Sequence, residues 1–226
     1  MAAVLKNVVA MATSTWNKLV SNISKRFRSK RGQLLREQFP ELASMRIVDV
    51  GGSLHFWQES GLNIPPEHLT IYNVGAGDAH AAQSDVYSRV SVKTYDGRRL
   101  PEHDQSFDLA ICNSVIEHVP LEQRDALVAE LQRVAKHVYV QTPAKSFPIE
   151  PHFLVPLLQW LPKRLGYTLA KVSPWRLLSR PSRATIKSYF FGTNLLTAGA
   201  VRTLLPNAKL FRERLLGFTK SYVAIQ

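Results

Sequence analysis

Five short apolar runs, separated by turn residues and helical patterns, constrain the fold of this chain most strongly. They cover residues 46–50, 69–74, 90–93, 107–112 and 137–141 of a chain of 226 residues. Short apolar runs that end in turn residues are typical of parallel strands buried on both faces. Because helical patterns alternate with these runs, we predict an α/β fold, a mostly parallel sheet with helices on both faces. Such sheets bind ligands at the carboxyl ends of their strands.

Charge is distributed unevenly along the chain. Residues 1–36 hold eight basic and no acidic residues, residues 37–150 hold nine basic and sixteen acidic, and residues 151–226 hold twelve basic and one acidic. We therefore expect a basic amphipathic N-terminal segment, 1–36, and one domain, 37–226, with a basic lid-like insertion at about 146–190. Basic ends predict an anionic partner: a membrane surface, nucleic acid or a phosphorylated substrate.

The N-terminal segment has apolar residues at helical spacing and a basic cluster at its end. Three interpretations fit this pattern: an amphipathic helix at a membrane interface, an organellar targeting peptide, or a helix that packs on the domain. The sequence contains no apolar stretch of about 18 or more residues, which a spanning helix would need. The single cysteine, Cys112, fits a reducing compartment. We expect a cytoplasmic protein, and peripheral membrane contact and organellar targeting both stay open.

Further elements are predicted in the second half of the chain from apolar spacing and turn residues. They are an amphipathic helix at 121–135, a short helix at 153–161, a final helix at 195–205, and an antiparallel hairpin of strands 209–216 and 219–225.

The sequence Asp49-Val50-Gly51-Gly52-Ser53 covers the end of the first predicted strand and the turn that follows it. Glycines at this place let backbone N–H groups approach a ligand, and a carboxylate can accept hydrogen bonds from an ammonium group or its water. By itself the pattern also fits a tight turn between a strand and a helix.

Three later motifs are more specific. Residues 95–101 read Tyr-Asp-Gly-Arg-Arg-Leu-Pro, residues 106–109 read Ser-Phe-Asp-Leu, and residues 113–119 read Asn-Ser-Val-Ile-Glu-His-Val. In this order and spacing they resemble the type 11 subgroup of class I methyltransferases, over about residues 45–145. The hairpin that ends in Lys-Ser-Tyr-Val-Ala, residues 220–224, is also similar to that subgroup.

The resemblance implies a Rossmann-like sheet of seven strands, the last antiparallel, and S-adenosylmethionine as cofactor. It also implies roles for particular residues: the methionine end on Asp49, Gly51 and Gly52, the ribose on Asn73, the adenine on Asp96 and the Gly97 backbone, and the methyl-donor side on Asn113 or Ser114. The chain departs from the family pattern in three places. Ser53-Leu54 stands where a further glycine is common, Asn73 is neutral where an acid is expected, and only a brief helix fits between Leu54 and Pro65.

Two histidines are the candidate catalytic residues. His118 follows the fourth predicted strand and His152 follows the fifth, so both are expected at the same edge of the sheet. An oxygen acceptor must lose its proton, and histidine has the pKa for that task. We predict that one of the two is the base or orients the acceptor; the alternative for His118 is a capping or supporting role. No metal ligands are predicted.

Aromatic residues alternate with Lys and Arg between residues 160 and 183. This mixture suits a membrane headgroup zone or RNA, and a solvated basic lid is the third interpretation. The leading prediction is an O-methyltransferase that acts on a small-molecule, glycan or lipid-linked acceptor near an anionic membrane surface. Nucleic acid is a less favoured partner. The alternatives are an RNA methyltransferase and a non-catalytic binding protein that keeps the fold.

Overall fold

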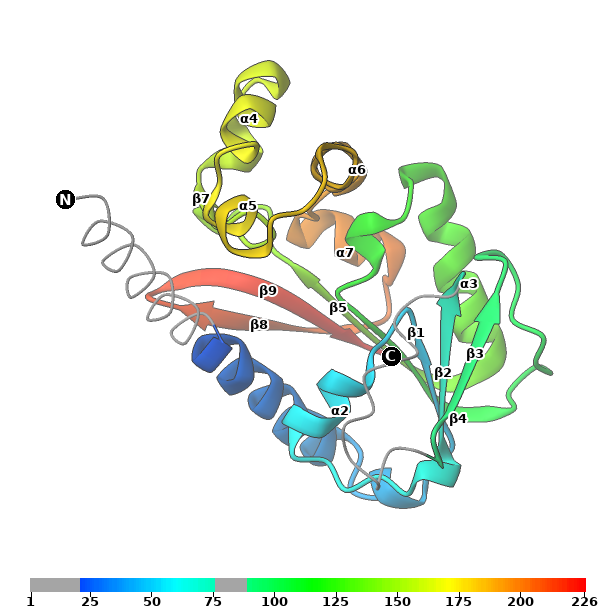
Figure 1. Cartoon of the computed structure of the whole chain (residues 1–226). Helices are drawn as coiled ribbons and strands as arrows, with labels where there is room; N and C mark the ends of the chain where they lie inside the picture. Colours follow the sequence, from blue (N-terminus) through cyan, green and yellow to red (C-terminus); the bar gives the residue numbers. More distant parts are fainter. Residues whose placement is uncertain (1–20, 76–88) are drawn as a thin grey trace.

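The computed structural model of the chain describes residues 21–75 and 89–226 (Figure 1). Its centre is a seven-stranded sheet of order β3-β2-β1-β4-β5-β9-β8. Strands β1 to β5 run parallel to one another. Strand β9 lies between β5 and β8 and is antiparallel to both. The strands are β1 (Ile47–Val50), β2 (Leu69–Val74), β3 (Ser91–Tyr95), β4 (Phe107–Asn113), β5 (Ala135–Pro143), β8 (Lys209–Leu215) and β9 (Phe218–Ile225). The predicted α/β fold is confirmed.

Helices cover both faces of this sheet (Figure 1). The helix at residues 21–38 and α2 (Leu54–Ser60) lie on one face, and α3 (Arg124–Val134) and α7 (Ala198–Leu204) lie on the other. The short α2 agrees with the brief helix predicted there.

Each face has its own apolar core because successive strand residues point to opposite sides. In β4, Leu109 and Ile111 pack with the helix at 21–38 and with α2, while Ala110 and Cys112 pack with α3 and α7. The predicted helices 121–135 and 195–205 correspond to α3 and α7, and the predicted hairpin to β8 and β9. Within the described ranges, no helix combines the length and apolar composition needed to cross a bilayer.

The described part of the N-terminal segment packs on the domain. Phe27, Arg31 and Leu35 are buried and lie four residues apart, so they share one face of the helix. This helix continues past Arg36 to residue 38. The membrane and targeting interpretations rest largely on residues 1–20, which lie outside the described residues.

Residues 146–192, the lid segment, extend beyond the carboxyl end of β5 (Figure 1). They form β6 (Ile149–Glu150), β7 (Val155–Pro156), the 3-10 helix η6 (Leu158–Trp160), α4 (Lys163–Ala170), α5 (Pro174–Ser179) and α6 (Arg183–Gly192). These elements have a separate apolar cluster whose buried members are Phe153, Leu158, Ala170 and Ile186.

The predicted helix at 153–161 was wrong. Leu154 and Leu157 have positive φ angles of 57° and 60°, which a right-handed helix does not allow. Pro156 between them lacks the N–H that a helix interior needs and pairs instead in β7. The apolar spacing therefore reflected burial against the lid helices rather than helical periodicity.

Candidate functional site

Asp49 lies on β1 and is completely buried. Its Oδ2 accepts a hydrogen bond of 2.8 Å from Trp57 Nε1, and its Oδ1 has no hydrogen-bond partner among the described residues. Burial raises the pKa of Asp49 to about 7, although the Trp57 hydrogen bond acts in the opposite direction. A buried carboxylate with one open oxygen fits a cationic ligand group at this place.

The backbone that follows Asp49 carries no side chains at Gly51 and Gly52, and the structure leaves no space for a Cβ at either position. Gly51 has a φ of 75°, and a Cβ there would lie 2.6 Å from Val115 Cγ2. A Cβ at Gly52 would lie 1.9 Å from Asp49 Oδ2. The loop can therefore approach a ligand closely only with glycine at both positions.

Asn73 and Asp96 follow the same edge of the sheet. Asn73 lies near the end of β2, and its Nδ2 donates to the Gly52 carbonyl at 3.2 Å. Asp96 directly follows β3, and its Oδ1 accepts from the backbone N–H groups of Arg98 and Arg99 at 2.8 and 3.1 Å. These hydrogen bonds, that of Arg98 first, hold the pKa of Asp96 below its usual value. Gly97 has a φ of 79° and forms the turn that follows.

Asn113 and Ser114 end β4. Ser114 Oγ donates to Gln141 Oε1 at 2.7 Å, and Asn113 Oδ1 accepts from Arg31 Nη1 at 3.1 Å. All eight predicted cofactor residues therefore lie on β1 to β4 or the turns that follow these strands. Arg31 was not predicted as part of this site, because the spacing does not distinguish it from the other basic residues of its helix.

Arg31 forms a buried ion pair with Glu213 of β8. Its Nε and Nη2 lie 2.9 and 2.7 Å from the carboxylate oxygens, and the two side chains are 7% and 9% exposed. Burial alone would raise the pKa of Glu213, but Arg31 and a hydrogen bond from Ser221 outweigh it, so that pKa is lowered. The N-terminal helix is thereby tied to the last hairpin and to the end of β4.

The two candidate catalytic histidines lie together, with ring centroids 4.9 Å apart. His118 ends the 3-10 helix η4 (Ile116–His118), and its Nδ1 lies 3.2 Å from Thr193 Oγ1. His152 follows β6, and its Nδ1 lies 2.7 Å from Glu150 Oε1. Burial and the neighbouring His152 lower the pKa of His118 to about 4. The pKa of His152 is raised, because Glu150 outweighs the opposing effect of burial.

Glu117 lies beside this pair and is completely buried. Its Oε2 accepts from Thr142 Oγ1 at 3.0 Å, whereas its Oε1 has no hydrogen-bond partner in the described part of the chain. Burial raises its pKa. Neither Glu117, which is part of the motif at residues 113–119, nor Glu150 was predicted as a site residue; their proximity to His118 and His152 in the sequence was the signal that could have identified them.

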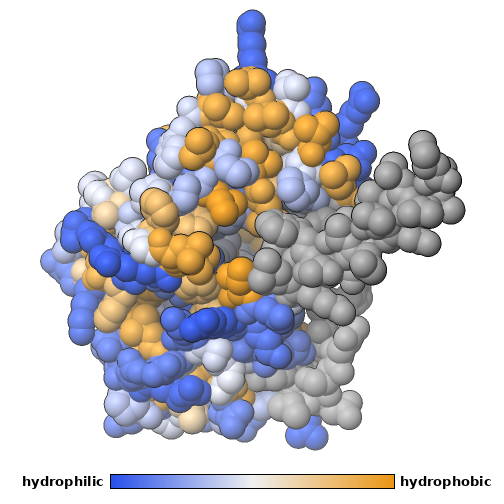
Figure 2. All heavy atoms as spheres, turned by 90° about the vertical axis from the view of Figure 1, so that its left-hand side faces the viewer, coloured by the Kyte–Doolittle hydropathy of each residue, from blue (hydrophilic) through white to orange (hydrophobic). Residues whose placement is uncertain are grey.

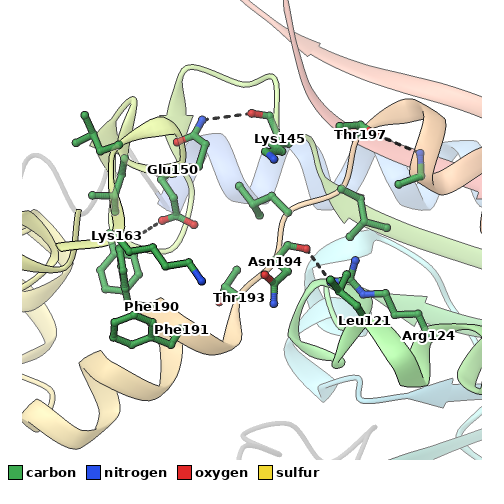
Figure 3. A pocket seen from close by; sticks show the side chains of 17 residues that line it. Leu121, Arg124, Lys145, Glu150, Lys163, Phe190, Phe191, Thr193, Asn194 and Thr197 are labelled. Carbon is green, nitrogen blue, oxygen red and sulfur yellow. Dashed lines mark hydrogen bonds between the residues drawn. The ribbon is translucent and has the colours of Figure 1, made fainter. Parts of the chain in front are cut away.

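A cavity of about 440 Å³ opens between the lid segment and the sheet edge. Phe153, Phe190 and Phe191 contribute aromatic rings to its wall, and Arg124, Lys145 and Lys163 contribute positive charge. Figure 3 shows Lys163 reaching toward the pocket from the lid, with Arg124 on the opposite side hydrogen-bonded to Asn194. Glu150, which holds His152, also lines the cavity.

Comparison with known proteins gives a consistent result. Residues 49–137 match the model of a family described as a methyltransferase domain. The PH0226 protein from Pyrococcus horikoshii is 13% identical, with a TM-score of 0.57 over 90% of each chain. A SAM dependent methyltransferase from Archaeoglobus fulgidus is 12% identical, with a TM-score of 0.52 over 88% of this chain and 93% of that one.

Magnesium protoporphyrin IX methyltransferase from Synechocystis, solved with bound SAH, is 12% identical, with a TM-score of 0.50 over 89% of this chain and 82% of that one. At these identities the likeness shows a common fold. No curated protein matches the sequence significantly.

Proposed function

We propose that the chain is a class I S-adenosylmethionine-dependent methyltransferase and that it transfers the methyl group to an oxygen of a small-molecule, glycan or lipid-linked acceptor. One observation carries the proposal. The histidine pair borders a cavity beneath the lid segment, because Glu150 and Thr193 line that cavity and contact His152 and His118, respectively. Methyl transfer from a sulfonium needs the donor and acceptor aligned and water excluded, and a covered cavity beside the histidines supports an acceptor site there.

The cofactor fits the residues at this edge. The open Oδ1 of Asp49 is suited to the ammonium of the methionine end, and the backbone N–H of Gly52 to its carboxylate, whereas the Gly51 N–H donates to the Tyr72 carbonyl and only leaves room for the ligand. Asn73 is placed for a ribose hydroxyl, and Asp96 with the Gly97 backbone for the adenine. Asn113 and Ser114 then line the side that carries the methyl group. When bound, S-adenosylmethionine supplies an activated methyl on sulfur; these residues only hold and orient it.

The acceptor cavity favours a molecule with an apolar body and an anionic group. Its aromatic wall can cover apolar surface, and no hydrogen bond among the described residues engages the ammonium groups of Lys145 and Lys163. Two such cations are typical of phosphate or carboxylate recognition. The reactive oxygen would lie toward His118 and His152, which orient it or take its proton.

Calorimetric titration with S-adenosylmethionine tests the function. The protein should bind it with a micromolar Kd, and Asp96→Ala should weaken binding by about 10–100-fold, since a hydrogen bond to a charged group contributes about 1.5–3 kcal/mol. Asp125→Ala, in the first turn of α3, is the matched control and should bind normally. Absence of binding by the folded wild-type protein would contradict the cofactor proposal, and normal binding by Asp96→Ala would remove this residue from the site.

The surface of the lid segment supports a membrane location for the acceptor. Trp160, Leu165, Val172 and Leu177 are between 50% and 65% exposed. Figure 2 shows apolar residues gathered on the upper part of the face that it displays, over the lid helices. Seven Lys and Arg residues and no acid lie between residues 163 and 187. Apolar side chains among basic residues match an anionic membrane surface, so we infer a peripheral enzyme on the cytoplasmic side.

Co-sedimentation with vesicles tests this location. The protein should bind phosphatidylcholine vesicles only when they contain phosphatidylserine, and added salt should weaken binding. Trp160→Ser with Leu165→Ser should reduce it by roughly tenfold or more, because each side chain loses part of the ~1.5–3 kcal/mol of apolar burial. Leu216→Ser, at the 89% exposed turn of the last hairpin, is the control. Equal vesicle binding by the wild type, the double variant and Leu216→Ser would contradict membrane binding through the lid segment. Binding to single-stranded RNA but not to vesicles would favour RNA as the partner.

A further inference from the structure

Glu117, His118 and His152 form a cluster at the edge where β4 and β5 end. Each offers one ligand atom, and the three atoms lie within 4.8 Å of one another. Two metal–ligand bonds of about 2.0–2.2 Å nearly span that distance. Glu117 and His118 are neighbours in η4, whereas His152 approaches from the lid segment, so the cluster joins two parts of the fold.

Both histidines have one ring nitrogen already engaged. His152 Nδ1 pairs with Glu150 and His118 Nδ1 with Thr193, so both Nε2 atoms are left as candidate ligands. A histidine that binds a metal generally uses its second nitrogen in this way, and a carboxylate partner is typical. Glu150 itself is held, because its Oε2 accepts from the Phe153 backbone at 2.6 Å.

Glu117 adds an independent observation. Its Oε2 is engaged by Thr142, but its buried Oε1 has no partner among the described residues. A buried carboxylate oxygen without a hydrogen bond is costly, and each such atom needs an explanation. A cation bound between Oε1 and the two Nε2 atoms would provide the missing interaction.

We propose that Glu117, His118 and His152 bind a divalent transition-metal cation such as Zn²⁺ or Mn²⁺. Two imidazoles and one carboxylate are a suitable ligand set for these ions and leave a coordination position open. The role of the cation rests on the proposed function: the open position would take the acceptor oxygen. The histidines would then act on the acceptor through the metal that they hold.

Methyl transfer to an acceptor hydroxyl at this site needs only the acceptor and S-adenosylmethionine. An acceptor hydroxyl bound at the open position has a lowered pKa and loses its proton to water. The oxygen lone pair forms the new O–CH₃ bond, while the electrons of the S–CH₃ bond go to sulfur. The products are the methyl ether or ester of the acceptor, S-adenosylhomocysteine and one proton.

Calorimetric titration of the full chain, prepared without a histidine tag and treated with a chelator, tests the site with Zn²⁺ or Mn²⁺ alone. We expect one ion per chain. Glu117→Gln and His152→Ala should each weaken binding by about 100-fold or more, because outer partners alone contribute about 10–100-fold. Glu150→Gln, which removes such an outer partner, should weaken it by about 10–100-fold. His103→Ala, at an exposed position before β4, should bind normally.

Titration of the same proteins with S-adenosylmethionine separates this inference from the proposed function. The variants should keep wild-type affinity for the cofactor, which also shows that they are folded. Should His152→Ala fail to fold, His118→Ala provides the test in its place. No metal binding by the wild type, or equal binding by Glu117→Gln, would overturn the metal site. Metal binding without cofactor binding would leave the site standing and contradict the proposed function.

Discussion

Replacing Arg31 with methionine should lower the free energy of unfolding by about 3–5 kcal/mol. Arg31 is the main partner of the buried Glu213 carboxylate and also donates to Asn113. Without it, Glu213 keeps, among the described residues, only the hydrogen bond from Ser221 and the weaker attraction of Lys220 to compensate its buried charge. Urea unfolding followed by circular dichroism measures the change.

Two further variants separate this ion pair from a general loss of positive charge. Arg36→Met removes an exposed arginine of the same helix and should change stability by less than about 0.5 kcal/mol. Arg31→Met combined with Glu213→Leu should recover most of the loss, because replacing both members of a buried pair by apolar groups is often neutral. If Arg31→Met alone proved as stable as Arg36→Met, this account of the ion pair would be contradicted.

The effect of Arg31 should depend on pH in a defined direction. Burial alone would raise the pKa of Glu213, but Arg31 lowers it below the ordinary value of 4.5. A lowered carboxyl pKa contributes stability that is present above pH 4.5 and is lost as the pH falls through the folded-state value. Without Arg31, burial should raise that pKa instead, so the variant gains relative stability on acidification. The stability difference between wild type and Arg31→Met should therefore begin to shrink above pH 4.5, as the variant's carboxyl takes up its proton, and should shrink further below pH 4.5, as the wild type loses its contribution.

Gly52→Ala should weaken S-adenosylmethionine binding by about 100-fold, roughly 3 kcal/mol. The new Cβ would overlap the Asp49 carboxylate, which is buried and hydrogen-bonded to Trp57 and cannot swing away freely. The carboxylate must move, so the group proposed for the cofactor ammonium is displaced and its hydrogen bond to Trp57 is lost. Calorimetric titration measures the affinity, and the far-ultraviolet spectrum should remain that of a folded protein.

Gly192→Ala is the matched control, since a Cβ at the end of α6 would meet nothing within 4 Å. It should bind the cofactor as the wild type does. If Gly52→Ala also keeps wild-type affinity, the cofactor does not lie against this loop, and the roles proposed for Gly51 and Gly52 would be withdrawn.

The sheet could be predicted because the buried strands are rich in apolar residues and are closed by turn residues. Residues 69–74 were predicted as a strand and are β2 with the same bounds. The predicted cofactor residues could be placed along one edge because they follow consecutive strands, and parallel strands have their carboxyl ends at the same edge. Their individual contacts with the cofactor remain predictions.

Other features depend on contacts between distant residues and could not be read from local patterns. Arg31 and Glu213 are 182 residues apart, and nothing near either one indicates its partner. His118 and His152 were predicted at one edge, but only the folded chain shows that Glu117 joins them. The error at 153–161 has a local cause, because apolar spacing cannot reveal two leucines with positive φ.

The pairing of Arg31 with Glu213 also bears on how the chain is made. A ribosome that adds about 5–20 residues per second needs roughly 10–40 s to proceed from the first of these residues to the second. During that interval the helix at 21–38 has been synthesised, but β8 and β9, to which Arg31 and Phe211 tie it, do not yet exist. The apolar face of a nascent amphipathic helix is then free to meet a chaperone or a lipid surface before its own domain can cover it.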